Sequence, residues 1–141
     1  AKYSEYALLG FLIFLVLKNR RLLKIAGVAL GAAIVSRFIV AEIIRFFYDR
    51  PRPFEVLDVV QLVPHSMGAS FPSGHAAFYF ALSWCLFFWN KRLGALFLGI
   101  VVFMTTARVF VGVHYPADIL GGLAVGFLCA LGMYRGFQKK F

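Results

Sequence analysis

Three short clusters of polar residues, each beside a long apolar stretch, carry the side chains that could do chemistry. The first runs from Arg45 to Pro53 and includes Arg52, seven residues after Arg45. Guanidinium groups bind phosphate oxygens bidentately and keep their charge at any pH. Pro51 and Pro53 oppose a helix, so we expect Arg52 to lie on an extended turn. The cluster could bind an anion, or it could be a basic anchor at a membrane edge.

The second cluster is Pro72-Ser73-Gly74-His75. Ser73 can cap a helix that starts at Gly74, and a glycine lets an anion approach the backbone. The N–H groups and the dipole of a helix start favour a phosphate there. His75 would lie beside that anion and could donate or accept a proton. Taken alone, the pattern is more typical of an ordinary capped helix start with an incidental histidine.

The third cluster runs from Arg108 to Asp118. Arg108 lies near the end of an apolar segment, where a charge is costly and indicates a function. His114 precedes Asp118 by four residues, and Pro116 suits the first turn of a helix. A carboxylate bound to one imidazole nitrogen fixes the tautomer and leaves the other nitrogen able to attack. The alternative is a His–Asp pair that only stabilises the helix start.

Together the clusters supply what a reaction at an anion requires, namely cationic donors, a nucleophile, an orienting carboxylate and a proton donor. A zinc site is the rival interpretation, because His75, His114 and Asp118 are all possible ligands. Three arginines beside them would repel a cation. We therefore expect no metal and no other cofactor.

The composition predicts that membrane-spanning helices position these clusters. The chain has 141 residues, of which 62% are hydrophobic, and its mean hydropathy is +0.83. A soluble domain of this size could not bury so much apolar surface. The sequence therefore predicts a single all-α, polytopic membrane bundle over residues 1–141. We expect five spanning segments, at residues 4–17, 25–47, 74–89, 93–111 and 116–134.

The net charge of +9 is distributed as an orientation signal rather than as a nucleic-acid surface. Basic residues cluster between the first and second segments, between the third and fourth, and after the fifth. These three connections lie on one side, which the positive-inside rule makes the cytoplasm. The three chemical clusters then face the periplasm or the cell exterior, as expected of a multi-pass protein of the cell (inner) membrane. Within the second segment, Glu42 is a possible partner for Arg37, although a separation of five residues is poor α-helix geometry.

The three clusters resemble the signature of the type 2 phosphatidic acid phosphatase superfamily of lipid phosphatases. Its parts occur here, in order and with the family's spacing, as Arg45…Arg52-Pro53, Pro72-Ser73-Gly74-His75, and Ala107-Arg108…His114…Asp118. The match covers residues 45–118, about half of the chain. Arg45 stands where the family usually has Lys, and Ala107 where it usually has Ser. Membrane members typically have six spanning helices, so we expect one to be missing before Ala1.

The resemblance implies a mechanism in which His114 attacks phosphorus and becomes phosphohistidine, Asp118 orients it, and His75 protonates the leaving oxygen. It also implies that the phosphate is held by Arg45, Arg52, Ser73, Gly74 and Arg108. The substrate class would be a lipid phosphate or diphosphate in the bilayer, first of all undecaprenyl diphosphate, or else phosphatidic acid or phosphatidylglycerol phosphate. Soluble vanadium haloperoxidases share the signature, but the composition excludes them. A non-catalytic lipid-binding or transport protein remains the alternative of another class.

Overall fold

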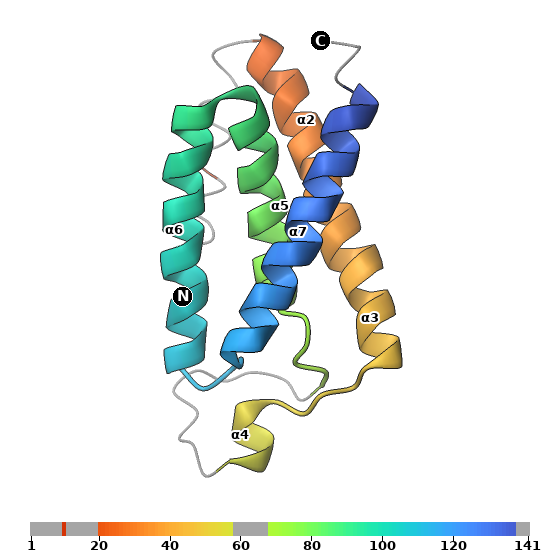
Figure 1. Cartoon of the computed structure of the whole chain (residues 1–141), viewed down its shortest axis with the longest axis vertical. Coiled ribbons are helices and arrows are strands. Elements are labelled where there is room, and N and C mark those ends of the chain that lie inside the picture. The colour runs from red at the N-terminus through yellow and green to blue at the C-terminus, as the bar shows by residue number, and fades with distance from the viewer. Residues whose placement is uncertain (1–9, 11–19, 58–67, 138–141) are drawn as a thin grey trace.

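The computed structural model describes Gly10 and residues 20–57 and 68–137, and all regular structure in these ranges is helical (Figure 1). The predicted first span, residues 4–17, lies outside them apart from Gly10. The elements, in chain order, are α2 (Arg20–Ile34), the π-helix η1 (Val35–Val40), α3 (Ala41–Phe47), α4 (Pro53–Val56), α5 (Gly74–Trp89), α6 (Lys91–Phe110) and α7 (Pro116–Phe137).

Within the described ranges, three helical runs are long and apolar enough to cross a membrane: Leu23–Phe47, Lys91–Phe110 and Pro116–Phe137. They coincide within a few residues with three of the predicted spans and confirm an all-α membrane bundle. The first run passes without a break from α2 through η1 into α3. The helix predicted at residues 74–89 has those bounds as α5, but with 16 residues it is shorter than the others.

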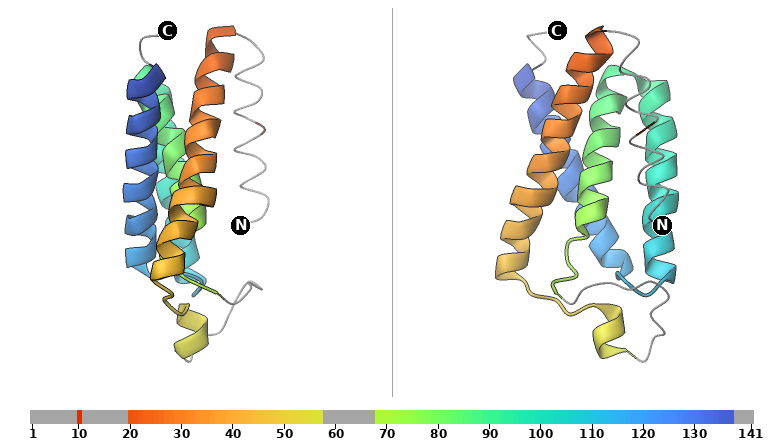
Figure 2. Two further views of the ribbon diagram at one scale, coloured as in Figure 1. Left: turned by 90° about the vertical axis from the view of Figure 1, so that its right-hand side faces the viewer. Right: turned by 180° about the vertical axis from the view of Figure 1, so that it is seen from behind.

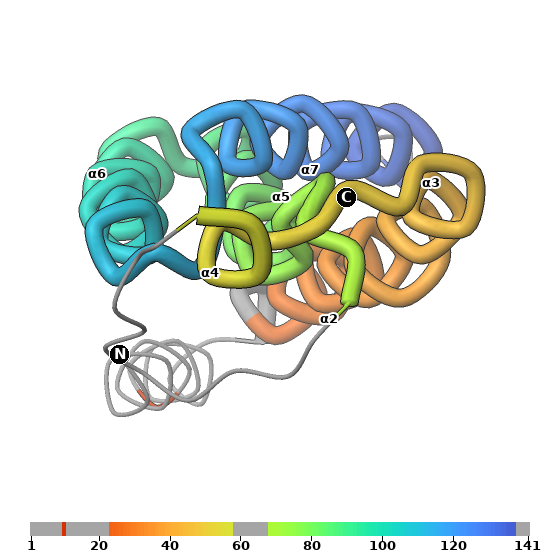
Figure 3. The backbone as a smooth tube through the Cα atoms, turned by 90° about the horizontal axis from the view of Figure 1, so that it is seen from below, coloured from red at the N-terminus to blue at the C-terminus, as the bar shows by residue number. Residues whose placement is uncertain are grey.

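Helix α5 is the centre of the bundle, because α2, α6 and α7 all pack against it (Figure 3). Its buried residues include Phe80 and Cys85, at most 1% exposed. The approach to α7 is close, because a Cβ atom at Gly122 would lie 2.5 Å from the Cβ of Ala76. Small residues of this kind let membrane helices pack backbone to backbone.

The three chemical clusters and the basic connecting residues lie at opposite ends of the bundle. α3 and α6 end, and α5 and α7 begin, at one end of the bundle, and α4 lies just beyond it (Figures 1 and 2). We call this the signature end. The α5–α6 connection, with Lys91 and Arg92, and the last turn of α7, with Arg135, lie at the opposite end. All three chemical clusters therefore converge at the signature end.

Candidate active site

The turn between α6 and α7 positions His114. The Gly112 N–H donates to the Val109 carbonyl at 3.0 Å, and the Val113 N–H donates to the Arg108 carbonyl at 3.2 Å. This pair of bonds is the Schellman motif, which needs a residue in the left-handed region, and Gly112 supplies it with a φ of +72°. The chain is thereby turned back toward the bundle directly before His114.

His114 and Asp118 form a buried pair, 2% and 0% exposed. His114 Nδ1 lies 3.4 Å from Asp118 Oδ2. The same Oδ2 accepts a bond of 2.8 Å from the Tyr115 N–H, which ties the carboxylate to the first turn of α7. Asp118 therefore favours a proton on Nδ1 of His114, and Nε2 then carries the lone pair.

Two further side chains, neither of them predicted from the sequence, hold Asp118. The Ser70 hydroxyl donates to Asp118 Oδ2 and also lies 3.4 Å from His114 Nδ1. Arg50 Nη1 lies 3.2 Å from Asp118 Oδ1, and its guanidinium carbon stacks 3.9 Å from the centre of the Tyr115 ring. Arg50 could have been found, since it is a third arginine in the first cluster. Ser70 carried no signal, because it lies in the long loop without a motif of its own.

The start of α5 lies directly beside this pair. The Ser73 hydroxyl accepts from the Ala76 N–H at 3.4 Å, which confirms it as the helix cap. The Ser73 N–H donates to the Asp118 carbonyl at 2.9 Å, which joins the cap of α5 to the first turn of α7. His75 follows in the first turn of α5 and is half-buried. The nucleophile and proton donor expected from sequence are thus on adjoining helix starts.

Gly74 has a role that the sequence did not indicate. A Cβ atom at this position would lie 2.5 Å from Cζ, Nε and Nη1 of Arg37. The missing side chain makes room for the Arg37 guanidinium, which therefore packs against the first residue of α5.

Arg45 approaches the start of α5 from α3. Its Nη2 donates to the Pro72 carbonyl at 2.9 Å, and its Nη1 lies 2.8 Å from Glu42 Oε1. Its Nε is buried and has no hydrogen-bond partner among the residues that the structure describes. A buried guanidinium donor in this position is suited to an anionic ligand.

Arg52 lies against the turn that carries His114 and is 6% exposed. Its Nε donates to the Gly68 carbonyl at 3.1 Å, and its Nη1 to the Val113 carbonyl at 3.4 Å. Burial lowers the pKa of its guanidinium below its ordinary value, but the group stays charged at neutral pH. Arg108, half-buried in the last turn of α6, is near enough for its charge to lower the pKa of Arg52 as well.

Burial also lowers the pKa of His114 below its usual 6.5. The hydrogen bond to Asp118 opposes this shift, whereas the charges of Arg52 and Arg108 add to it. The net direction keeps His114 neutral at neutral pH, which is the state that a nucleophilic imidazole needs.

The zinc interpretation finds no support in the described part of the chain, where no three His, Cys, Asp or Glu side chains gather as metal ligands would. Asp118 has its oxygens directed at Arg50, Ser70 and the Tyr115 N–H instead. That no metal is required stays a prediction.

Comparison with known proteins agrees with the signature. Residues 26–141 match the PAP2 superfamily profile. The chain is 30% identical over 139 residues to undecaprenyl-diphosphatase BcrC of Bacillus subtilis (strain 168), covering 94% of this chain and 70% of that protein. It spans between 43% and 70% of the length of the curated relatives compared.

Two solved structures share the fold. LpxE from Aquifex aeolicus superposes with a TM-score of 0.76 and 27% identity, covering 92% of this chain and 77% of that one. A PAP2-type phosphatidylglycerolphosphate phosphatase from Bacillus subtilis superposes with a TM-score of 0.61 and 26% identity, covering 96% of this chain and 71% of that one. With a profile match over far more than half of its length, the chain belongs to the PAP2 superfamily, the membrane lipid phosphatase family that its signature predicts.

Proposed function

We propose that this protein removes the terminal phosphate of a lipid diphosphate, undecaprenyl diphosphate being the first choice, through a phosphohistidine intermediate. The observation that carries the proposal is the buried His114–Asp118 pair at the end of a membrane bundle, with Arg45, Arg52 and Arg108 beside it. The name of the Bacillus subtilis relative supports a polyprenyl diphosphate as the substrate.

The first half of the reaction follows from the roles of the side chains. His114 Nε2 attacks the terminal phosphorus while Asp118 stabilises the imidazolium that forms. The N–P bond forms as the P–O bond to the bridging oxygen breaks, and His75 gives its proton to that oxygen. The arginines and the Ser73–Gly74 backbone hold the phosphoryl oxygens, because phosphoryl transfer is promoted mainly by positioning and charge stabilisation.

The second half regenerates the enzyme. His75, now neutral, takes a proton from a water molecule, whose oxygen attacks the phosphorus of the phosphohistidine. The N–P bond breaks, its electron pair returns to His114 Nε2, and inorganic phosphate leaves. No metal takes part in either half of this scheme.

Two other lipids are the main alternatives. Phosphatidylglycerol phosphate is favoured by the name of the Bacillus subtilis structure with the same fold, and phosphatidic acid is the family's eponymous substrate. Either would use the same residues, since only the leaving oxygen changes. We further propose that the signature end faces the periplasm or the cell exterior, because Lys91, Arg92 and Arg135 lie at the opposite end.

The decisive experiment measures phosphate release in detergent with EDTA present, from undecaprenyl diphosphate, phosphatidylglycerol phosphate and phosphatidic acid. We expect release that survives EDTA, is fastest with the diphosphate, and is lost in His114→Ala. A substrate labelled in its terminal phosphate should leave acid-labile, alkali-stable label on the wild-type protein only.

The matched control is Arg92→Gln, which removes one charge at the opposite end of the bundle and should keep the activity. Activity in His114→Ala would refute the phosphohistidine. Tight binding of these lipids without phosphate release, by protein shown to be folded, would refute the enzyme and favour the lipid-binding alternative.

A further inference from the structure

The π-helical turn in the first long helix brings together two residues that an α-helix would keep apart. In η1 the hydrogen bonds connect residues five apart, as between the Ala41 N–H and the Ser36 carbonyl. Arg37 and Glu42 are five apart, and here Nη1 and Oε1 meet at 2.8 Å. The poor geometry expected for this pair from the sequence is removed by the change of helix type.

The turn is fastened to the centre of the bundle. Ser36 is fully buried, and its hydroxyl lies 2.9 Å from the Ala33 carbonyl and 3.0 Å from the Ala77 carbonyl of α5. The position of Arg37 relative to α5 is therefore set by a buried contact between helices. Single π-helical turns of this kind are frequent at functional sites.

Arg37 is thereby placed in the active site. Its guanidinium packs against Gly74 at the start of α5, one residue before His75. It also shares Glu42 Oε1 with Arg45, each at 2.8 Å, so the two guanidinium groups lie side by side. Two cations share one carboxylate, which leaves an excess positive charge beside the site. The Arg37 side chain is 25% exposed, so a ligand can reach it.

The backbone of Arg37 lies deeper in the membrane than the backbone of Arg45. The run from α2 to α3 leads toward the signature end (Figure 1), and Arg37 precedes Arg45 by eight residues. At about 1.5 Å per residue or less, its backbone lies about 10 Å further from that end. In a lipid diphosphate the phosphate linked to the hydrocarbon chain is likewise deeper than the terminal phosphate.

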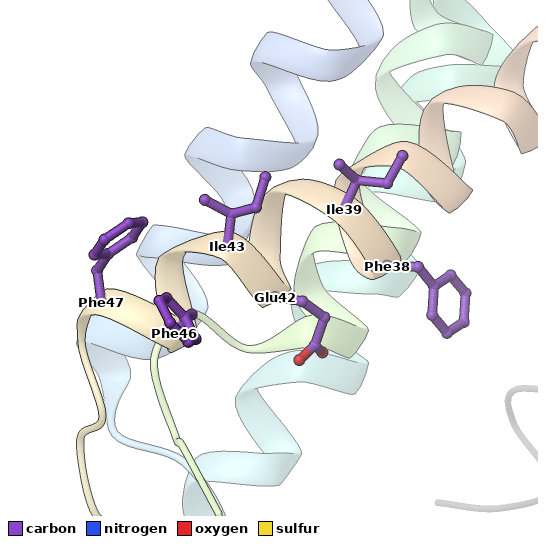
Figure 4. Close-up of a pocket in the computed structure, with 6 residues that line it drawn as sticks. All are labelled: Phe38, Ile39, Glu42, Ile43, Phe46 and Phe47. Atoms are coloured by element: carbon purple, nitrogen blue, oxygen red, sulfur yellow. The ribbon is translucent and has the colours of Figure 1, made fainter.

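Glu42 is held in this arrangement by its surroundings. It lies on the wall of a hollow of about 350 Å³ whose other residues are all apolar (Figure 4). These are Phe38, Ile39, Ile43, Phe46 and Phe47. A carboxylate beside hydrocarbon is costly unless it is paired, so before substrate binds Glu42 keeps both guanidinium groups together.

We propose that Arg37 binds the inner phosphate of a lipid diphosphate, while Arg45 binds the terminal phosphate that His114 attacks. The inference rests on the proposed function and adds a residue that determines specificity for diphosphates over monophosphates. The substrate phosphates replace Glu42 as partners of the two arginines. When the bond from the terminal phosphorus to the bridging oxygen breaks, Arg37 stabilises the charge that grows on the departing lipid monophosphate.

The test uses two lipids with the same acyl chains, diacylglycerol diphosphate and phosphatidic acid, and compares kcat/KM for each. We expect Arg37→Gln to lower the value for the diphosphate about ten- to hundred-fold more than the value for phosphatidic acid, as for a lost charge-assisted hydrogen bond. Arg37→Lys, which keeps the charge but not the fork, should recover part of this difference. Arg92→Gln should leave the ratio unchanged.

A structural role for Arg37 predicts a different pattern. Arg37→Gln would then lower both values by the same factor, because Glu42 keeps Arg45 as its partner and neither lipid loses a donor to its phosphate. That result would overturn the inference. If Arg37→Gln alone does not fold, Arg37→Lys decides by the same ratio, because it keeps the charge and loses the planar guanidinium. A wild-type protein that hydrolyses neither of these lipids nor undecaprenyl diphosphate would overturn the proposed function instead.

Discussion

Both oxygens of the Asp118 carboxylate are bonded by neighbouring groups. One oxygen receives Arg50, and the other receives Ser70, the Tyr115 N–H and His114. A carboxylate has about four acceptor positions, so this one has little freedom to rotate. Its orientation, and with it the tautomer of His114, is therefore set before any substrate binds.

Ser70→Ala tests that orientation. Because Ser70 bonds the pair and not the substrate, we expect kcat to fall about ten-fold with KM nearly unchanged, measured in steady state with the preferred lipid. Ser83→Ala is the matched control, since Ser83 is equally buried and its hydroxyl donates to the Tyr79 carbonyl within α5, away from the His114–Asp118 pair. A raised KM at constant kcat would show that Ser70 contacts the substrate instead.

The lowered pKa of His114 gives a pH prediction with a definite sign. A base whose pKa falls below 6.5 in the folded protein is neutral above 6.5 and gains its proton only at a lower pH. We expect imidazole ¹⁵N shifts of the protein in nanodiscs to show that His114 is a neutral imidazole at pH 6.5, with its single proton on Nδ1. The variant His114→Asn identifies which signals belong to His114. Half-protonation above pH 6.5 would contradict this.

At the scale of the element, the turn that ends α6 depends on one backbone conformation. Gly112→Ala places a side chain at a φ of +72°, which costs about 1–2 kcal/mol and misdirects His114. We expect a lower thermal unfolding temperature together with a lower kcat. Gly99→Ala is the same substitution in the middle of α6, where a Cβ would meet none of the described residues within 4 Å, and it should be neutral or stabilising. Equal effects at the two positions would refute the role of the turn.

The helices were largely predictable, and the contacts between their ends were not. Apolar length gave the spans, and the Ser73 cap gave the start of α5, because both signals are local in sequence. The π-turn at Val35–Val40 follows no local pattern, and it contains Ser36, whose hydroxyl bonds the Ala77 carbonyl of α5 across the helix interface. Ser70 joins the site through a tertiary contact with Asp118, which a single sequence does not reveal.

At the scale of the whole molecule, the distribution of charge predicts which end faces outward. Single cysteines at Glu55 and at Asn90, both exposed, would report the two ends after Cys85 and Cys129 are replaced by Ala. In intact cells a membrane-impermeant maleimide should label Glu55→Cys and not Asn90→Cys, and both should react after lysis. The reverse labelling would place the active site in the cytoplasm.

The shortness of α5 has a consequence for the membrane itself. Sixteen residues extend about 24 Å, less than the hydrocarbon thickness of about 30 Å that the bilayer presents. The spans around α5 are longer, and α3 and α6 end further toward the signature end than α5 begins (Figure 2). The start of α5 at Gly74 is therefore set back from that end, and the phosphates of a lipid must descend to meet it. A thicker bilayer lengthens this descent, so turnover should slow as the acyl chains of the surrounding bilayer lengthen.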